Sequence, residues 1–281
     1  MLGRDHLHGA RTLSLIDPRA IIDPSARLGS NVAVGPWTII GPDVEIGDEC
    51  WIASHVVIKG PTRLGRRNKV YQFSCIGEDT SDKSYKGEPT TLEVGDDNVF
   101  REGSNVHRGT LKDQGRTVIG SGCLFMPYVH VAHDCVLGDH IIMANYSAAS
   151  GHVHIGDHAN LGGYAGVAQY RSVGSHAHVS AMSLVIKDVP DFVTVSGNPA
   201  SALGVNLEGL RRQGFSKARI QDIQDAYRVV CRSGLTVSQA CEQLAEAAGR
   251  APEVEQFLQF VKNSRWGIVR PRSRSSDGEG V

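Results

Sequence analysis

The chain of 281 residues contains no run of eighteen apolar residues, so we expect no transmembrane helix and no insertion into a membrane. Residues 1–15 lack the apolar segment of a secretory signal peptide, which favours a cytoplasmic location. The formal net charge of −1 argues against a protein that binds nucleic acid over its whole surface, and no basic arm or finger motif is present. We therefore expect a cytoplasmic protein without a nucleic-acid partner.

Cysteine is also scarce. The six cysteines include no CxxC pair, so the sequence indicates no disulfide framework. Cys50, Cys123 and Cys135 each stand four residues after an aliphatic residue, in the position where a hexapeptide repeat places small side chains. We expect the cysteines to pack in the core rather than to react.

The repeat itself is the main feature of the sequence. Leu, Ile or Val recurs at every sixth position from Ile16 to Ile76, without exception, and glycine often follows it. A second register runs from Ile119 to Val185, and its exceptions are Phe125, Met143 and Ala149. A period of six predicts a parallel β-helix, in which three hexads close one triangular coil.

In such a coil the aliphatic side chain points inward, and we expect the neighbouring glycine to accept the backbone geometry of a tight turn. Successive coils stack at the strand spacing of roughly 4.8 Å. The pattern resembles the left-handed parallel β-helix of the hexapeptide acyltransferases, and only that resemblance implies the handedness. The predicted fold class is mainly β, with a small α-helical domain after the β-helix.

The interruptions of the repeat predict the domain organisation. The β-helix should occupy residues 16–190, with polar loop excursions at 78–91 and 110–116, where binding residues usually lie. Residues 191–270 should form a helical domain, while 1–15 are an extension and 271–281 have the composition of a disordered tail. Ser216, the pair Thr236 and Gln239, and Pro252 are typical of the starts of three helices, which should end near Arg232, Ala248 and Asn263.

Histidines gather between Phe125 and His154. His152 follows His133 by one coil and one further position, and Gln169 follows it by two full coils. His107 lies one coil before His133 if the second excursion adds seven residues to that turn. The spacing therefore predicts a column of polar side chains on one edge, and histidine suits general-base chemistry. Surface positions are expected for the remaining histidines, which include His140, His158, His176 and His178.

A metal site is the alternative interpretation, and it would place the protein in another functional class. His130, His133 and His152 could supply three imidazoles to zinc across a subunit boundary. The hexapeptide carbonic anhydrases build such a site on the same fold. A zinc-dependent hydratase therefore remains open at this point.

Several motifs together resemble one acyltransferase family. They are KVYQFSCIGED (69–79), YKGEPT (85–90), NVHRGT (105–110), HVAHDC (130–135), GNPA (197–200) and GVNLEGLRRQGFS (204–216). Over about residues 14–270 the chain is similar to the UDP-N-acetylglucosamine O-acyltransferases, which begin lipid A biosynthesis in Gram-negative bacteria.

The resemblance implies transfer of a 3-hydroxyacyl group from acyl carrier protein to the 3-position of UDP-N-acetylglucosamine, without metal or cofactor. By this resemblance, His133 is the general base and Asp134 polarises it. The Gly151 N–H is implied to stabilise the oxyanion. The sugar and acyl-pantetheine pocket is implied to contain Asp82, His107, His130, His152 and Gln169. The nucleotide is implied to contact Asn206, Glu208 and Arg212.

The same resemblance implies a homotrimer with sites between neighbouring subunits, and exposed Trp37, Phe73 and Tyr128 favour association independently. Ala181 falls where the family ends its acyl tunnel and suggests an intermediate or moderately long chain. The acidic carrier protein needs a basic landing surface, for which the candidates are Arg211, Arg212, Lys217 and Arg219.

Two positions depart from the family pattern. Ser84 stands where the family usually has lysine, although Lys83 is adjacent, and Ala168 stands where it usually has histidine. Both positions lie near the sugar in the family. A UDP-3-amino-sugar acceptor that yields an amide therefore remains an alternative, as does a paralogue that only binds the nucleotide sugar.

Overall fold

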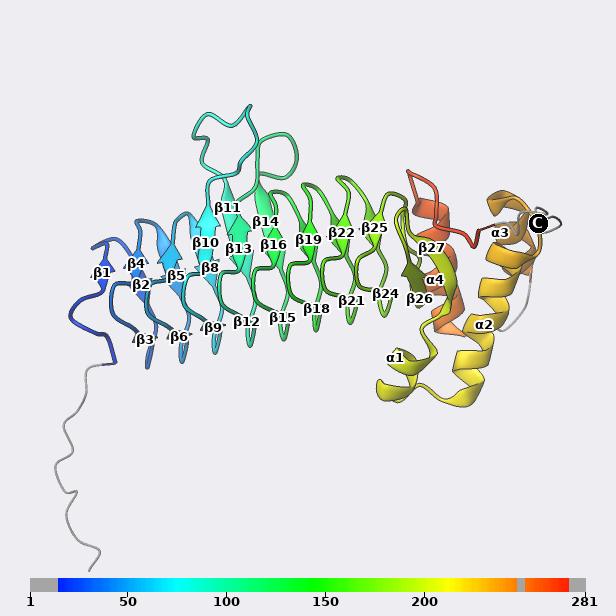
Figure 1. The fold of residues 1–281 in the computed structure, drawn as a ribbon, viewed down its shortest axis with the longest axis horizontal. Coiled ribbons are helices and arrows are strands. Elements are labelled where there is room, and N and C mark those ends of the chain that lie inside the picture. Colours follow the sequence, from blue (N-terminus) through cyan, green and yellow to red (C-terminus); the bar gives the residue numbers. More distant parts are fainter. Residues whose placement is uncertain (1–14, 247–250, 273–281) are drawn as a thin grey trace, which may run out of the picture.

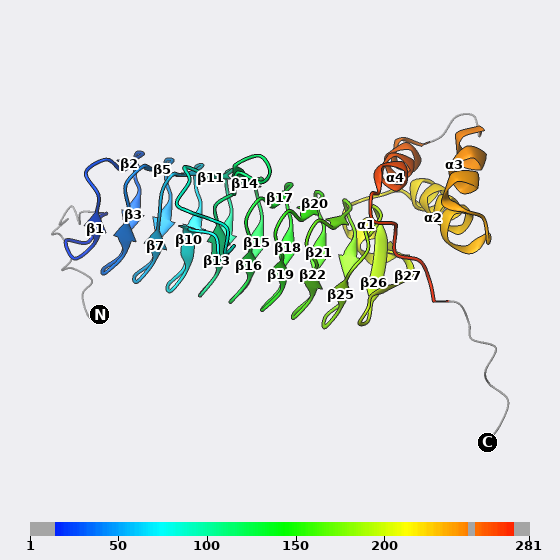
Figure 2. The ribbon, with the colours of Figure 1, turned by 90° about the horizontal axis from the view of Figure 1, so that it is seen from above.

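The computed structural model describes residues 15–246 and 251–272. Short strands form a long triangular prism, and a group of helices sits at its C-terminal end (Figures 1 and 2). The predicted extension and tail lie almost entirely outside the described residues, as does the end predicted for the second helix at Ala248. Among the described residues, no helix combines the length and apolarity needed to cross a bilayer.

Three parallel sheets form the faces of the prism, each built from every third strand. Sheet 1 contains β1 (Ile21–Ile22), β4 (Ile39–Ile40), β7 (Val57–Ile58), β10 (Cys75–Glu78), β13 (Asn105–His107), β16 (His130–Val131), β19 (Ala148–Ala149), β22 (Gly166–Val167) and β25 (Leu184–Val185). Sheet 2 contains β2 (Arg27–Leu28), β5 (Val44–Ile46), β8 (Thr62–Leu64), β11 (Thr91–Val94), β14 (Arg116–Ile119), β17 (Val136–Leu137), β20 (His154–Ile155) and β23 (Ser172–Val173). Sheet 3 contains β3 (Ala33–Val34), β6 (Trp51–Ile52), β9 (Lys69–Val70), β12 (Val99–Phe100), β15 (Leu124–Phe125), β18 (Ile142–Met143), β21 (Asn160–Leu161), β24 (His178–Val179), β26 (Val193–Ser196) and the antiparallel β27 (Ser201–Val205).

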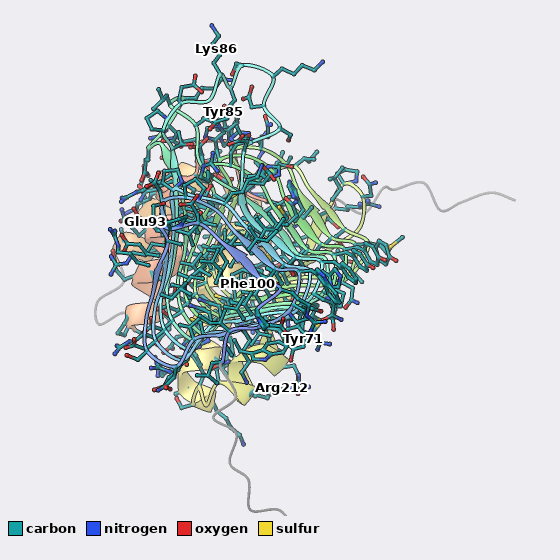
Figure 3. The ribbon with its side chains drawn as sticks, turned by 90° about the vertical axis from the view of Figure 1, so that its left-hand side faces the viewer. Tyr71, Tyr85, Lys86, Glu93, Phe100 and Arg212 are labelled. Atoms are coloured by element: carbon teal, nitrogen blue, oxygen red, sulfur yellow. The ribbon has the colours of Figure 1, made fainter. Side chains whose placement is uncertain are left out.

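The second residue of most hexad strands points into the prism, as the repeat predicts. Ile40, Ile58 and Ile76 are at most 1% exposed, although they come from successive coils of one sheet. Phe100 and Phe125 stack inside the prism with ring centroids 4.8 Å apart, and Figure 3 shows Phe100 within the triangular section. Cys50, Cys123 and Cys135 are buried in this core, which confirms their predicted packing role, and all six cysteines are free thiols.

The reason given for the repeat glycines holds at Gly77, which has positive φ, but it is wrong for Gly35 and Gly47. There the positive φ belongs to Trp37 and Glu49, two positions later. A Cβ on Gly35 would instead lie 2.6 Å from the Ser54 backbone nitrogen, and one on Gly47 would lie 2.7 Å from the Gly65 carbonyl carbon. Glycine is needed there because the next coil passes too close for a side chain.

Both loop excursions leave the prism at the same corner, between sheets 1 and 2 (Figure 1). Cys75 pairs with Asn105 and not with a residue three hexads further along, so the first excursion adds twelve residues. Asn105 pairs with His130, so the second excursion adds the predicted seven. Figure 3 shows Tyr85 and Lys86 of the first excursion standing outside the triangular section. The insertions therefore enlarge one corner without disturbing the stack.

Within the described ranges, four helices follow the prism: α1 (Leu207–Arg212), α2 (Lys217–Arg232), α3 (Val237–Glu246) and α4 (Pro252–Asn263). The predicted caps are present, because Ser216 Oγ accepts from the Arg219 N–H and Thr236 and Gln239 exchange hydrogen bonds. The sequence prediction missed the short α1. Beyond α4 the chain returns to the last coil, where Asp188 N–H donates to the Gly267 carbonyl and thereby ties the helices to the prism.

Asp191 is a buried carboxyl at this junction. Its Oδ1 accepts the Ser175 N–H at 2.6 Å, while only 4% of the residue is exposed. Burial raises the pKa of Asp191 to about 7, although the bonds from Ser175 and Gln256 act in the opposite direction. The folded state therefore holds this proton more tightly than the unfolded chain.

We expect the free energy of unfolding to fall as pH rises from about 4 to about 7, because the unfolded carboxyl ionises first. Asp191→Asn should remove roughly 2 kcal/mol of the difference in unfolding free energy between pH 5 and pH 8. Denaturant unfolding at both pH values measures the effect. Asp157→Asn is the control, because Asp157 accepts the Asp139 N–H at an exposed position. An unchanged pH difference in Asp191→Asn would contradict the buried-carboxyl account.

Candidate active site

The corner that carries both excursions also carries His133, and we call it the His133 corner. His130 pairs with Ala148 and Ala148 with Gly166, so His133, Gly151 and Gln169 occupy equivalent positions in three successive coils. The predicted alignment of Gln169 two coils from His133 is therefore correct. His107 and His152 lie in the coils before and after His133, one position to the side. Gln169 is exposed, whereas the three histidines are at most 8% exposed.

Asp134 fixes the orientation of His133. Its Oδ2 lies 2.8 Å from His133 Nδ1 and also accepts the Thr110 hydroxyl at 2.6 Å. Oδ1 accepts the Thr110 N–H, and the Asp134 N–H donates to Thr117 Oγ1. Burial alone would raise the pKa of Asp134, but the hydrogen bonds from His133 and Thr110 hold it below its usual range. An ionised Asp134 makes Nδ1 the protonated nitrogen, so Nε2 of His133 is free to accept a proton.

Gly151 lies directly against the His133 ring. A Cβ at this position would be 2.5 Å from His133 Cε1 and 2.7 Å from Nε2. In the described part of the chain, the Gly151 N–H has no hydrogen-bond acceptor. The absence of a side chain therefore lets the Gly151 backbone, with its unused N–H, lie against the His133 ring.

His152 contacts four side chains. Its Nδ1 lies 3.1 Å from Asp113 Oδ2, and its Nε2 lies 3.7 Å from Asp134 Oδ2. The ring stands edge-on to His133 at 5.0 Å and stacks on Tyr170 at 4.4 Å. Asp113 belongs to the second excursion, so this loop sets the position of His152.

His107 and His130 form a second imidazole pair, with ring centroids 5.0 Å apart. Burial, followed by the nearby His130, lowers the pKa of His107 to about 4. Burial and then His133 lower the pKa of His130. Both rings are consequently neutral at neutral pH. Among the residues that the structure describes, none is a hydrogen-bond partner of the buried His107 Nδ1, so this atom can bind a polar group of a ligand.

Asp82 comes from the first excursion. Its Oδ1 accepts the N–H and hydroxyl of Ser84, each at 2.8 Å, and its Oδ2 lies 2.6 Å from Lys112 Nζ. The bond from Lys112 and then those from Ser84 hold the pKa of Asp82 well below its usual range. The sequence prediction assigned no role to Lys112, Asp113 or Thr117, because a loop sequence does not reveal which coil it contacts.

Asn206, Glu208 and Arg212 gather elsewhere, in a hollow of about 510 Å³ between α1 and the corner of sheets 2 and 3. Arg212 Nε donates to Glu208 Oε1 at 3.0 Å, and Asn206 caps α1 while donating to the His176 carbonyl. His140, His158 and His176 stack along this corner at 4.9 and 4.8 Å, so we call it the His140 corner. His140 is exposed, as predicted, whereas His158 and His176 are half-buried, and all three line the hollow.

The third corner, between sheets 3 and 1, is an exposed apolar ladder that we call the aromatic corner. Tyr128, Tyr146 and Tyr164 stack at 4.9 Å, and Met182 continues the column. Trp37 is 53% exposed and Phe73 68%, as predicted. Ala181 lies on this corner and is exposed.

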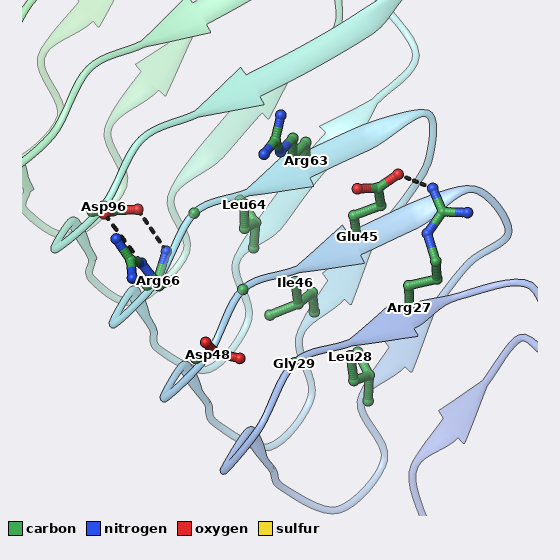
Figure 4. Close-up of a pocket in the computed structure, with 12 residues that line it drawn as sticks. Arg27, Leu28, Gly29, Glu45, Ile46, Asp48, Arg63, Leu64, Arg66 and Asp96 are labelled. Atoms are coloured by element: carbon green, nitrogen blue, oxygen red, sulfur yellow. Dashed lines mark hydrogen bonds and ion pairs between the residues drawn. The ribbon is translucent and has the colours of Figure 1, made fainter.

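A further hollow of about 590 Å³ lies on the first coils of sheet 2 (Figure 4). Arg27 pairs with Glu45, and the Arg66 guanidinium lies 3.6 Å from Asp96 Oδ2, so most of the charges that line this hollow are already matched. None of the predicted site residues lies there. The hollow therefore marks a charged outer face and not a second active site.

The geometry does not match the predicted zinc site of His130, His133 and His152. Among the residues that the structure describes, the group that could hold an ion is His133, Asp134 and His152. His130 is not part of this group. Asp134 Oδ2 already accepts hydrogen bonds from His133 and Thr110, so the arrangement serves to orient an imidazole.

Comparison with known proteins identifies the relatives of the chain. Residues 188–269 match the model of UDP N-acetylglucosamine O-acyltransferase domain 2, and residues 116–148 match that of the bacterial transferase hexapeptide. An acyl-[acyl-carrier-protein]–UDP-N-acetylglucosamine O-acyltransferase from Stutzerimonas stutzeri is 55% identical over 92% of this chain and 100% of its own length.

Solved structures agree with these relatives. UDP-N-acetylglucosamine O-acyltransferase from Moraxella catarrhalis superimposes with a TM-score of 0.90 at 43% identity, over 92% of this chain and 100% of that one. The enzyme from Acinetobacter baumannii gives a TM-score of 0.89 at 47% identity, over 92% and 100%. The predicted left-handed β-helix with a small helical part is confirmed by these neighbours and by the hexapeptide match.

Gly151→Ala should move the His133 ring and leave the fold intact, because the new methyl group would overlap a side chain and not the backbone. We expect a crystal structure of the variant to show the distance from His133 Nδ1 to Asp134 Oδ2 lengthened beyond hydrogen-bonding range. Gly163→Ala is the control, because the nearest atom to its Cβ is 3.4 Å away. An undisturbed His133 in Gly151→Ala would show that the glycine is not required for the ring position.

Proposed function

This chain belongs to the UDP-N-acetylglucosamine O-acyltransferase family, and on that basis we propose how its residues carry out the reaction. The enzyme transfers a 3-hydroxyacyl group from acyl carrier protein to the 3-hydroxyl of UDP-N-acetylglucosamine, the first step of lipid A biosynthesis. The relatives are named as O-acyltransferases, which does not favour a zinc hydratase or an amide-forming enzyme. The observation that carries the mechanism is the contact between His133 Nδ1 and the buried Asp134 carboxylate, which makes Nε2 the nitrogen that faces away from Asp134 and can exchange a proton with a substrate.

His133 Nε2 takes the proton of the sugar 3-hydroxyl as the oxygen attacks the thioester carbonyl carbon. The Gly151 N–H donates to the carbonyl oxygen as negative charge develops on it. The tetrahedral intermediate collapses when the C–S bond breaks, and the imidazolium returns its proton to the departing thiolate. Ester and free carrier thiol are the products, and Asp134 stabilises the transient imidazolium.

Neutral imidazoles complete the pocket. The lowered pKa values of His107 and His130 prevent them from adding positive charge beside the base, which would oppose its protonation. Together with His152 and Gln169 they line the space for the sugar and the acyl-pantetheine arm. Asn206, Glu208 and Arg212 hold the nucleotide, and the guanidinium of Arg212 suits a phosphate.

His133→Ala should lower kcat for acyl transfer by about 10²–10⁴-fold, because general-base catalysis contributes that factor. Mass spectrometry of the acylated UDP-sugar measures the product, and light scattering checks that the assembly is intact. His154→Ala is the matched control, because His154 is exposed on sheet 2 of the neighbouring coil. Substantial turnover by His133→Ala would remove His133 from the role of base.

The active unit is a homotrimer, and the distribution of the three corners supports this part of the proposal. His133 and Arg212 lie at different corners of one chain, so a single prism does not bring base and nucleotide clamp together. If three parallel prisms place their aromatic corners on the threefold axis, sheet 1 of one chain faces sheet 3 of the next. The His133 corner then meets the His140 corner of the neighbour, and each pair of chains completes one site.

The outer faces of the sheets agree with that arrangement. The outward-facing first residue is uncharged in all nine strands of sheet 1, from Ile21 to Leu184. Sheet 3 presents mostly uncharged side chains outward, among them Trp51, Val99, Leu124 and Ile142. Charged pairs such as Arg27 with Glu45 lie on sheet 2, which would face water (Figure 4).

Mixed trimers test the shared site. His133→Ala and Arg212→Ala should each be inactive alone, because every site would lack one component. After denaturation and refolding of an equal mixture, about a quarter of the wild-type activity should return, since random mixed trimers each contain one intact site. Activity that stays at the level of the separate variants would place both residues in a site within one chain.

Three further features bear on the acyl chain, the carrier protein and the cellular location. Ala181 on the aromatic corner would end the acyl channel between neighbouring chains. Arg211, Arg212 and Lys217 are exposed and could attract the acidic carrier protein, although both arginines also pair with Glu208. Arg219 pairs with Glu253 and covers the Phe215 ring. Six free thiols support a reducing, cytoplasmic location.

A further inference from the structure

We propose that Lys112 of the second excursion positions the acceptor sugar and sets its orientation toward His133. The inference rests on the proposed function and names a residue that this function had left unassigned. Lys112 Nζ donates to Asp82 Oδ2 at 2.6 Å and so links the two excursions beside the His133 corner. Lys112 thus places an ammonium group directly on the Asp82 carboxylate.

The pair offers two kinds of hydrogen-bonding group to a ligand. Lys112 uses one N–H on Asp82 and keeps its other donors, because about half of its side chain is exposed. Asp82 is immobilised by Ser84 on one oxygen and by Lys112 on the other. A sugar hydroxyl both donates and accepts, so a fixed carboxylate beside an ammonium group matches a hydroxyl-bearing ring.

Lys112 also lies in a short segment that contacts the catalytic groups. Thr110 holds Asp134, and Asp113 holds His152, so residues on both sides of Lys112 are anchored to the site. The charge of Asp134 acts on Lys112 in addition to that of Asp82. The ammonium group is therefore within electrostatic reach of the His133 corner, where the sugar must lie for His133 to reach its hydroxyl.

The chain provides a way to restore the charge from another position. Ser84 Oγ lies 2.8 Å from Asp82 Oδ1, on the other oxygen of the same carboxylate. A lysine at position 84 could place an ammonium group beside Asp82 without Lys112. Recovery of sugar binding by a lysine at this position would show that the site needs the positive charge and not the contact that Lys112 makes between the two loops.

The test compares steady-state kinetics of Lys112→Met and wild type. Loss of a charged hydrogen bond should raise KM for the UDP-sugar by about 10–100-fold. The KM for the acyl donor and the Kd for UDP alone should stay unchanged, because neither ligand contains the sugar. Lys83→Met, at an exposed lysine of the first excursion, is the matched control and should behave as wild type. The double variant Lys112→Met/Ser84→Lys should recover most of the lost affinity for the UDP-sugar.

Three results would overturn the inference. They are an unchanged KM for the UDP-sugar in Lys112→Met, a parallel rise of both KM values with a lower melting temperature, and no recovery in the double variant. A parallel rise would show that Lys112 only ties the two loops together. A wild-type protein without acyl transfer would count against the proposed function itself, so the two failures are distinguishable.

Discussion

The stacking of coils through backbone hydrogen bonds is the constraint on which the rest of the molecule depends. Each coil donates to the next along all three faces, so any side chain is fixed relative to its equivalents in the adjoining coils. Gly35 and Gly47 show how little freedom remains, because a single Cβ there would overlap the next coil. The same rigidity brings His133, Gly151 and Gln169 into one column without any dedicated loop.

Against this regular frame, the site depends on one buried carboxylate. Asp134 has positive φ, is 2% exposed and accepts three hydrogen bonds from His133 and Thr110. These bonds compensate for the cost of keeping its charge out of water. Two of them come from Thr110, at the start of the second excursion, and Thr117, which follows that excursion, accepts the backbone N–H of Asp134. The inserted loop is therefore a structural part of the catalytic pair.

Much of this arrangement could be predicted from the sequence, because periodicity reports directly on the coil. The column at His133, the seven-residue excursion and the helix caps at Ser216 and Thr236 all follow from spacing and local chemistry. Contacts made by loops could not be predicted in this way, so Lys112 and Asp113 were missed. The sequence also did not reveal the stack of His158 and His176 or the hollow that they line. Their partner is α1, a helix of six residues whose pattern is too short to detect.

The placement of both excursions at one corner has a consequence for how such a protein can change. Twelve and seven extra residues leave the prism where a turn already lies, and Val94 and Ile119 resume the repeat in register. An insertion within one of the three sheets would preserve the pairing of its strands only if it added a complete coil. Changes in chain length during evolution are therefore best accommodated at this corner, where they remodel the entrance for ligands and leave the scaffold as it was.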